Sequence, residues 1–384
     1  MPDRHATLAC NLDGNLLRAA LPLFEAERVQ GLEWSFDAVF QHPALPPWFE
    51  ELLDAFGQAD RLVGHGVFFS LFSGRWSAEQ QRWLAELRRL SARFRFDHVT
   101  EHFGFMTGAD FHQGAPLGVP LTPSTLAIGR DRLQRLQDAC GVPVGLENLA
   151  FAYSLEEVRK HGDFLHALLE PVEGFLLLDL HNLYCQLHNF GVEAADLLAL
   201  YPLDRVRELH LSGGSWAEST DQPNRRIRRD THDDAVPDGV FDLLHVALDA
   251  CPNVAYVTLE QVGWGLDTEA ARSQFQRDFL TMDAAVRAKN EQEGGRAMRR
   301  FFSENNIAPN GPPLEDEVLH AQQRQLAAIL ETASDYRQAQ AWLAASDLAR
   351  SVWAVETWEP HLLETAIAIA QKWKEGMRPL GAEK

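Results

Sequence analysis

Two short stretches decide the fold, PVGLEN at 143–148 and GFLLLDLHN at 174–182. Each is an apolar run that ends abruptly in a carboxylate, Glu147 in the first and Asp179 in the second, with an amide residue close behind. A short apolar run bounded by polar residues is typical of a buried parallel strand. A helical pattern at 154–169 separates the two runs. They are therefore expected to be neighbours in a β/α barrel, whose chemistry lies at the carboxyl ends of its strands.

The rest of the chain repeats this alternation of strand and helix. Apolar runs with strand character lie at 7–11, 32–36, 62–67, 96–101, 142–147, 175–179, 206–211 and 254–260. Amphipathic helical patterns lie between most of them, at 78–90, 125–139, 155–169, 192–200 and 239–248. The alternation predicts an α/β fold with a parallel sheet, and eight units predict closure into a (β/α)8 TIM barrel. A doubly wound open sheet is the alternative, but we find no glycine-rich dinucleotide loop to support it.

The pattern changes after the eighth unit. We expect the barrel to occupy residues 1–285, a polar linker to follow at 286–313, and a small helical appendage to form at 314–384. Two long polar connections, 103–123 and 213–237, are expected to form walls of a functional site, as long loops at this face of a barrel usually do. Four tryptophans of the appendage are expected to pack rather than to bind a ligand: Trp342, Trp353, Trp358 and Trp373.

Composition and charge exclude several classes of function. The formal net charge of −20 disfavours a nucleic-acid binder, which needs a basic footprint. The basic run NRRIRR at 224–229 is a local exception, and it reads either as a solvated loop or as a clamp for an anionic substrate group. Four cysteines without CxxC spacing predict no thiolate zinc site and fit a reducing cytoplasm. We expect neither a signal peptide nor a membrane span.

Six of the predicted strand ends carry a histidine, aspartate or glutamate, and the connection at 213–237 adds DTH at 230–232. Such ends converge on one pocket in a barrel. Charged groups crowded together repel one another unless cations neutralise them, and imidazole with carboxylate suits iron, manganese or zinc. The candidates exceed the needs of one ion, so we predict a catalytic site for two or three metals, in which Glu147 can bridge two ions. Its predicted residues are His65, His102, Glu147, Asp179, His210, Asp230, His232 and Glu260.

Each candidate taken alone also has a structural interpretation. A lone histidine after a strand is usually hydrogen-bonded in the core, and Asp179 could be the N-cap of a following helix. These interpretations weaken because the same feature recurs at six strand ends. His181 and Asn182 are ambiguous, since His181 could point with Asp179 if the strand continued, whereas Asn182 would lie in a loop. Five further residues are expected to support the site or to be unrelated to it: His98, Glu101, His112, His188 and His245.

In this order, the pieces resemble the multinuclear non-haem iron TIM-barrel proteins, domain-of-unknown-function family 692. That family includes the catalytic subunit of methanobactin-forming oxazolone synthase and related enzymes that modify cysteine in peptide natural products. The matching pieces are GHGV at 64–67, EHF at 101–103, LEN at 146–148, LDLHNLY at 178–184, NFG at 189–191, HLSG at 210–213, DTHD at 230–233 and the final strand with Glu260. The chain departs from the family at NLDGN (11–15), at LEQV (259–262) and in its longer helical tail.

The resemblance implies a fold related to xylose isomerase and a site with two or three iron ions in a mixed Fe(II)/Fe(III) state. It implies that the matching residues are ligands, that Glu147 bridges, and that Asn182 is a further ligand. It also implies dioxygen as co-substrate, a cysteine-containing, ribosomally made precursor peptide as substrate, and a small partner protein that recognises the peptide's leader. The leading hypothesis is a cytoplasmic iron-dependent oxidase that binds a substrate thiolate at one ion and dioxygen at its neighbour.

Two other functions are compatible with the same residues. A divalent-metal isomerase or hydrolase of a sugar or phosphoester would use the ion as a Lewis acid or to activate water, and would work without oxygen. A non-catalytic metal-binding or scaffold protein would use its helical tail to recruit a partner. The charge of −20 disfavours an endonuclease.

Overall fold

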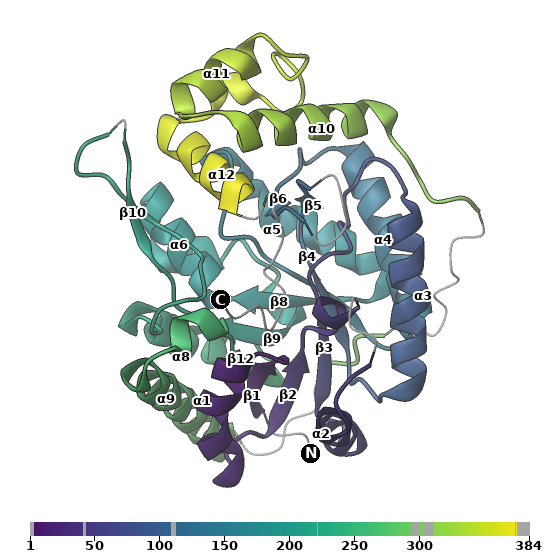
Figure 1. Ribbon diagram of the computed structural model, residues 1–384, viewed down its shortest axis with the longest axis vertical. Helices are drawn as coiled ribbons and strands as arrows, with labels where there is room; N and C mark the ends of the chain where they lie inside the picture. The colour runs from purple at the N-terminus through teal and green to yellow at the C-terminus, as the bar shows by residue number, and fades with distance from the viewer. Residues whose placement is uncertain are drawn as a thin grey trace.

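The computed structural model describes residues 4–40, 44–108, 113–220, 222–293, 299–302, 311–372 and 374. Eight parallel strands close into a barrel in the order β1–β12–β9–β8–β7–β4–β3–β2 (Figure 1). They are β1 His5–Cys10, β2 Gly31–Trp34, β3 Leu62–Gly66, β4 Val99–His102, β7 Val144–Glu147, β8 Phe175–Asp179, β9 Val206–Leu211 and β12 Tyr256–Leu259. Because β1 pairs with both β2 and β12, the barrel is closed. The predicted TIM barrel is confirmed, and the open-sheet alternative is wrong.

Helices follow the strands and pack around the barrel. Their bounds are α1 Gly14–Glu25, α2 Pro47–Gln58, α3 Ala78–Arg93, α4 Pro123–Cys140, α5 Leu155–Leu169, α6 Leu180–Phe190, α7 Ala194–Leu198, α8 Asp238–Ala250 and α9 Glu269–Glu293. Capping boxes at Ser77 and Thr122 fix the starts of α3 and α4, because each pairs a cap side chain with a backbone N–H that would otherwise lack a partner.

The predicted helix at 192–200 is wrong in extent. The helix α6 begins directly after β8, because the carboxylate of Asp179 accepts a hydrogen bond from the backbone N–H of Asn182 and caps the first turn. It ends at Gly191, whose φ of 64° is the left-handed conformation that commonly closes a helix. Only the short α7 remains within the predicted range. The expectation that Asn182 lies in a loop is therefore also wrong, since it lies in the first turn of α6.

The interior of the barrel is unusually polar. Barrel interiors are normally filled by branched apolar side chains. Here His98 packs edge-on against the rings of Phe175 and Tyr256, at centroid distances of 4.8 and 5.1 Å. Thr100 and Glu208 also lie in the interior and are fully buried. The apolar core instead lies mainly between the strands and the surrounding helices. The interior of the barrel is therefore available for polar and ionisable side chains.

Both long connections contain a two-stranded hairpin. The strands β5 Phe105–Met106 and β6 Pro116–Leu117 pair in the first, and β10 Trp216–Glu218 and β11 Arg226–Arg228 pair in the second. Three of the six residues of the basic run at 224–229 therefore lie in a strand, β11. The reading as a solvated loop is wrong for Arg228, which is only 4% exposed.

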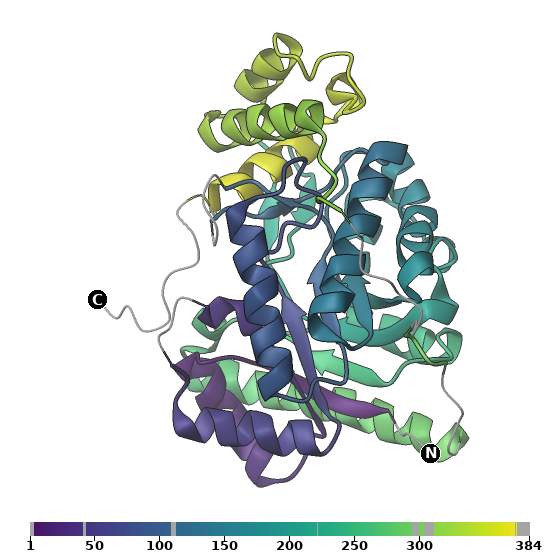
Figure 2. The ribbon, with the colours of Figure 1, turned by 90° about the vertical axis from the view of Figure 1, so that its right-hand side faces the viewer.

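The appendage consists of α10 Glu317–Thr332, α11 Tyr336–Ala344 and α12 Pro360–Lys372. It lies over the end of the barrel that carries the β5–β6 hairpin (Figures 1 and 2). Gln323 donates to the carbonyl of Phe72 at 2.8 Å, and Trp358 stacks on Tyr153 with ring centroids 4.0 Å apart. Trp353 and Trp358 are buried, as predicted, whereas Trp342 is 40% exposed and Trp373 lies outside the described residues.

The segment expected to be a linker begins as helix, since α9 continues to Glu293. Further along, Phe301 is buried beside Phe175, and Arg299 forms an ion pair with Asp204 at 2.9 Å. The division of the chain at 285 and 313 stays a prediction. Within the described ranges, no helix combines the length and the apolar character that crossing a membrane requires.

We predict that Trp358→Ala destabilises the protein by about 3–5 kcal/mol, because it removes a buried aromatic ring and leaves a cavity against Tyr153. Trp342→Ala is the matched control in the same appendage and is expected to cost less, since Trp342 is 40% exposed compared with 5% for Trp358. Urea denaturation followed by circular dichroism measures both. Equal effects of the two substitutions would contradict the docking of the appendage on the barrel.

Candidate metal centre

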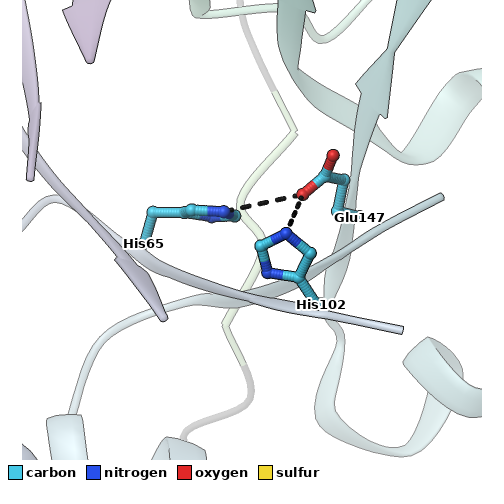
Figure 3. A group of neighbouring side chains, drawn as sticks. All are labelled: His65, His102 and Glu147. Carbon is cyan, nitrogen blue, oxygen red and sulfur yellow. Dashed lines mark ion pairs between the residues drawn. The ribbon is translucent and has the colours of Figure 1, made fainter. Parts of the chain in front are cut away.

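Five predicted ligands come from neighbouring strand ends. The register of the barrel sets His102 opposite Glu147 in the β4–β7 pair and Asp179 opposite His210 in the β8–β9 pair. Nε2 of His65 lies 3.5 Å and Nε2 of His102 lies 3.3 Å from the same oxygen, Oε2 of Glu147 (Figure 3). These side chains, which are far apart in the sequence, therefore lie close together, as predicted.

The side chains form two groups that share Glu147. In the group His65, His102 and Glu147, and in the group Glu147, Asp179 and His210, the potential ligand atoms all lie within 4.8 Å of one another. Ligand atoms that surround one ion at about 2.1 Å and at tetrahedral angles lie about 3.4 Å apart. The measured separations of 3.3 and 3.5 Å match that spacing. The first group is therefore compatible with a metal site, and the bridging of two ions by Glu147 stays a prediction.

Each of the three imidazoles has one nitrogen committed to a neighbour and the other turned to the site. His102 Nδ1 lies 3.0 Å from the carbonyl of Gly66, which can only accept, so this nitrogen carries the proton. His65 Nδ1 lies 2.8 Å from Oγ1 of Thr100, whose own proton goes to the carbonyl of Gly64. His210 Nε2 lies 2.8 Å from a carboxylate oxygen of Glu33. Such outer hydrogen bonds fix the tautomer of a metal-binding histidine.

The atoms turned to the site are buried but lack hydrogen bonds. A buried polar atom without a partner costs about 1–3 kcal/mol, so native structures contain few of them. Five lie together here and find no hydrogen-bond partner among the described residues: His65 Nε2, Glu147 Oε2, Asp179 Oδ2, Asn182 Oδ1 and His210 Nδ1. Each of the five is a nitrogen or oxygen atom of a kind that can bind a metal ion.

Asp179 caps a helix, as its structural interpretation predicts, and its role as a metal ligand stays a prediction. One carboxylate oxygen caps α6 through the N–H of Asn182, and the other is free for a cation. The side chain of Asn182 donates from Nδ2 to Oε1 of Glu147 at 3.1 Å and to the carbonyl of Asn148 at 2.7 Å. That donation leaves its Oδ1 turned away from these contacts. Asn182 therefore contacts Glu147 through Nδ2, and its role as a ligand stays a prediction.

The remaining predicted ligands form a second arm of the site. Oε2 of Glu260 lies 3.3 Å from Nδ1 of His210 and 3.4 Å from Nδ1 of His232. Nε2 of His232 lies 2.8 Å from Asp230, whose same oxygen lies 2.9 Å from Nδ1 of His181. Glu260 thus connects this arm to the first five residues.

His181 does not point with Asp179, because the strand ends at Asp179 and the helix turns the next side chain away. Arg228 Nε donates to His181 Nε2 at 3.1 Å, so the proton of the ring lies on Nδ1 and is donated to Asp230. His232 has a φ of 54°, which is uncommon for a residue other than glycine, and its carbonyl accepts from the N–H of Val262 at 2.8 Å. Strained backbone of this kind is often found at functional sites.

One side of the cluster is open and the other is sealed. The side chains of His65, Glu147, Asp179 and His210 are at most 4% exposed. Those of His102, Asp230, His232 and Glu260 are 16–26% exposed. A substrate can therefore reach the cluster only past the second group.

Burial and crowding shift the pKa values of the cluster strongly. Burial raises the pKa of Glu147 to about 8, and it raises the pKa of Asp179 well above its usual range. Burial lowers the pKa of His65. For His232, burial acts downward, but the carboxylates of Asp230 and Glu260 raise its pKa well above the usual value. Without cations the cluster must therefore hold protons that metal ions could replace.

Three residues that support the cluster were not among the predicted site residues. Glu33 lies within a predicted strand. The one feature of the sequence that could have identified it is a charged residue inside an apolar run. Asn148 accepts from the N–H of Asp179 at 2.7 Å and fixes the end of β8. Arg228 orients His181. These residues act through long-range contacts that sequence spacing does not reveal.

The five residues expected to support the site or to be unrelated to it behave differently. His98 lies deeper in the barrel and contacts Glu208 at 2.8 Å. Glu101 lies behind Gly66, where a Cβ on that glycine would come within 2.3 Å of its carboxylate. His188 packs against Trp216 and Tyr184, and His245 lies on the exposed face of α8. His112 lies outside the described residues.

The sequence of this chain is similar to those of several UPF0276 proteins. A UPF0276 protein of Acaryochloris marina is 33% identical over 240 residues, which cover 62% of this chain and 73% of that protein. A UPF0276 protein of Paraburkholderia phytofirmans is 34% identical over 197 residues, which cover 50% of this chain and 61% of that protein.

Solved structures similar to this chain include a zinc-containing IOLI protein, with 14% identity, 75% and 99% coverage and a TM-score of 0.48. A xylose isomerase-like TIM barrel protein from Mycobacterium smegmatis is 14% identical, with 72% and 90% coverage and a TM-score of 0.45. These likenesses are too distant to bear on function.

A family model described as "RiPP precursor modification enzyme MbnB/TglH/ChrH" matches residues 37–262, which include every predicted ligand. The match spans more than half of the chain. The chain belongs to the MbnB/TglH/ChrH family of RiPP precursor modification enzymes.

Proposed function

We propose that this protein is an iron-dependent oxidase that uses dioxygen to modify a cysteine of a ribosomally made precursor peptide. The observation that carries the proposal is the position of Glu147 in two ligand groups whose buried atoms lack other partners. Membership in a family of peptide-modifying enzymes supports a peptide substrate.

The first ion would be held by His65, His102 and Glu147. Two imidazoles and one carboxylate are the ligand set of many non-haem iron oxygenases, which keep further positions open for dioxygen and substrate. The second ion would be held by Glu147, Asp179 and His210 through Nδ1, and the family resemblance adds Asn182 as a further ligand. A third ion would lie between the second arm and the others, with Asp230, His232 and Glu260 as its ligands.

Iron, when bound, supplies the capacity to bind a thiolate and dioxygen and to exchange single electrons between the Fe(II) and Fe(III) states. The protein's own residues set the approach. The open side formed by His102, Asp230, His232 and Glu260 admits the cysteine, while the buried side excludes water from the ligands. His181, held by Arg228, keeps its proton on Nδ1 and fixes the orientation of Asp230.

The remaining part of the peptide would lie outside the cluster, along the hairpins and the appendage that surround the mouth. The family resemblance further supports a small partner protein that presents the leader of the peptide. Both assignments are part of the proposal.

Protein purified without oxygen is expected to contain two or three iron ions per chain, and to consume dioxygen when a cysteine-containing precursor peptide is added. Metal analysis, Mössbauer spectroscopy and an oxygen electrode test this. His65→Ala should lose iron because it removes a ligand of the first group, whereas His245→Ala, an exposed histidine on α8, should retain it. Stoichiometric zinc without iron, or turnover under nitrogen, would instead support the divalent-metal isomerase or hydrolase.

The metal-free protein is expected to lose stability as the pH rises from about 6.5 to 8. Across this window the unfolded chain, whose glutamates are already ionised, releases its remaining histidine protons. The folded chain keeps protons on His210 and His232, whose pKa values are raised, and on Glu147, whose pKa is about 8. The folded state therefore binds more protons than the unfolded state, and rising pH favours unfolding.

Each group that stays protonated throughout the window contributes roughly 2 kcal/mol to this loss. Thermal melts at pH 6.5 and 8, with a chelator and with metal added, measure it. Bound metal replaces the protons, so the loss should disappear in the loaded protein. Glu147→Gln cannot ionise and should show a shallower loss in the metal-free state. A metal-free protein whose stability rises over this window would contradict the assignment.

A further inference from the structure

Beneath the candidate metal centre, the barrel interior holds a second group of ionisable side chains. Glu33 from β2, Glu208 and His210 from β9, and His98 just before β4 are each 0% exposed. Burial of so many ionisable groups is costly unless they are paired and hydrogen-bonded. Their arrangement therefore has to be explained, and it bears on the single ligand that belongs to both groups, His210.

The contacts form two hydrogen-bonded sets, Glu33 with His210 and Glu208 with His98. Oε2 of Glu33 lies 2.8 Å from Nε2 of His210, and Oε2 of Glu208 lies 2.8 Å from Nε2 of His98. His98 Nδ1 lies 2.8 Å from Asp97, which accepts from Arg207 at 2.6 Å. The second set runs from Glu208 to a partly exposed ion pair of Asp97 and Arg207, and a 3.7 Å ion-pair contact between Oε1 of Glu208 and Nε2 of His210 brings the two sets together.

The potential ligand atoms of Glu33, Glu208 and His210 also lie within 4.8 Å of one another, which is the spacing of a possible cation site. Most of these atoms already face a donor. His210 occupies Oε2 of Glu33, His98 occupies Oε2 of Glu208, and Thr258 donates to Oε1 of Glu208 at 2.9 Å. Among the described residues, Oε1 of Glu33 is the only one of the four carboxylate oxygens without a hydrogen-bond partner. Hydrogen bonds within the protein, and not a cation, therefore account for this group of side chains.

We infer that Glu33 is a positioning residue for His210, an inference that rests on the proposed metal centre. By accepting the proton of Nε2, Glu33 selects the tautomer whose Nδ1 lone pair faces Glu147 and Asp179. A carboxylate in this position also makes the imidazole a stronger electron donor to its metal ion. Glu208 adds a second carboxylate, 3.7 Å from the same nitrogen.

The three histidines are not equivalent in this respect. His65 donates to a hydroxyl and His102 donates to a backbone carbonyl, which are both neutral. His210 has a carboxylate as its partner. The ion bound by His210 is accordingly favoured in the more highly charged state, so a mixed-valent pair should hold its ferric ion on the side of His210 and its ferrous ion on the side of His65.

The tautomer is tested on the unmodified full chain. Protein with ¹⁵N-labelled histidine is loaded with zinc, and NMR assigns the nitrogen of His210 that binds metal. Metal on Nδ1 with the proton on Nε2 is the expected result. The opposite tautomer in a metal-loaded protein overturns the inference and leaves the proposed metal centre standing. A protein that binds neither zinc nor iron overturns the proposed metal centre itself.

The charge effect is tested with Glu33→Gln, which keeps the shape and an acceptor oxygen but removes the charge. This variant should keep its iron, yet the midpoint potential of the pair should rise and the ferrous fraction in Mössbauer spectra should increase. Glu33→Ala should weaken metal binding about 10- to 100-fold. Asp283→Asn is the matched control, a buried carboxylate of α9 paired with Arg287, and it should change neither quantity. Wild-type potential and affinity in both Glu33 variants would overturn the inference.

Discussion

The main physical constraint on this structure is that carboxylate and imidazole side chains lie close together at the carboxyl ends of the barrel strands. Parallel register brings Glu147, Asp179 and His210 from consecutive strands into contact, in an interior from which water is excluded. Taking such charges out of water is expensive unless they are neutralised. The fold supplies hydrogen bonds to one atom of each ligand and leaves the other without a partner, which is the arrangement that a cation completes.

This constraint also explains where the apolar core lies. A barrel whose interior carries ionisable groups cannot rely on interior apolar packing in the usual way. The outward-facing residues of the strands, such as Leu146, Leu176 and Leu178, are fully buried against the helices instead. Hydrophobic stabilisation therefore comes mainly from the outer layer. Because the apolar layer between strands and helices stabilises the fold, the barrel interior can carry candidate ligands.

Much of the fold could be predicted because parallel strands buried on both faces read as apolar runs. The bounds of β8 and β9 match the predicted runs, and the ligands at strand ends followed from the abrupt change to polar residues. The helix α6 was missed because Asn182, in its first turn, was expected in a loop, although Asp179 had been considered as an N-cap. The stretch DLHN at 179–182 supplies both the cap and the first turn, together with candidate metal ligands.

Other features could not be predicted from local sequence. Glu33 lies in the middle of a strand, and its role emerges only when β2 and β9 face each other across the interior. The pairing within each long connection depends on hairpins of two or three residues per strand, which are too short for a periodic signal. The stacking of Trp358 on Tyr153 joins residues about 200 positions apart.

The docking of the appendage connects it to the chemistry. Its contacts fall on loops that follow the strands bearing the candidate ligands. Gln323 binds the loop after β3 through Phe72, Arg324 donates to the carbonyl of Thr107 after β4 at 2.8 Å, and Trp358 stacks on Tyr153 after β7. Glu364 accepts from the N–H of Thr220, after β9, at 3.0 Å. These strands carry His65, His102, Glu147 and His210. The appendage therefore ties together the loops around the mouth, and a peptide that approaches the open side of the cluster must do so beside it.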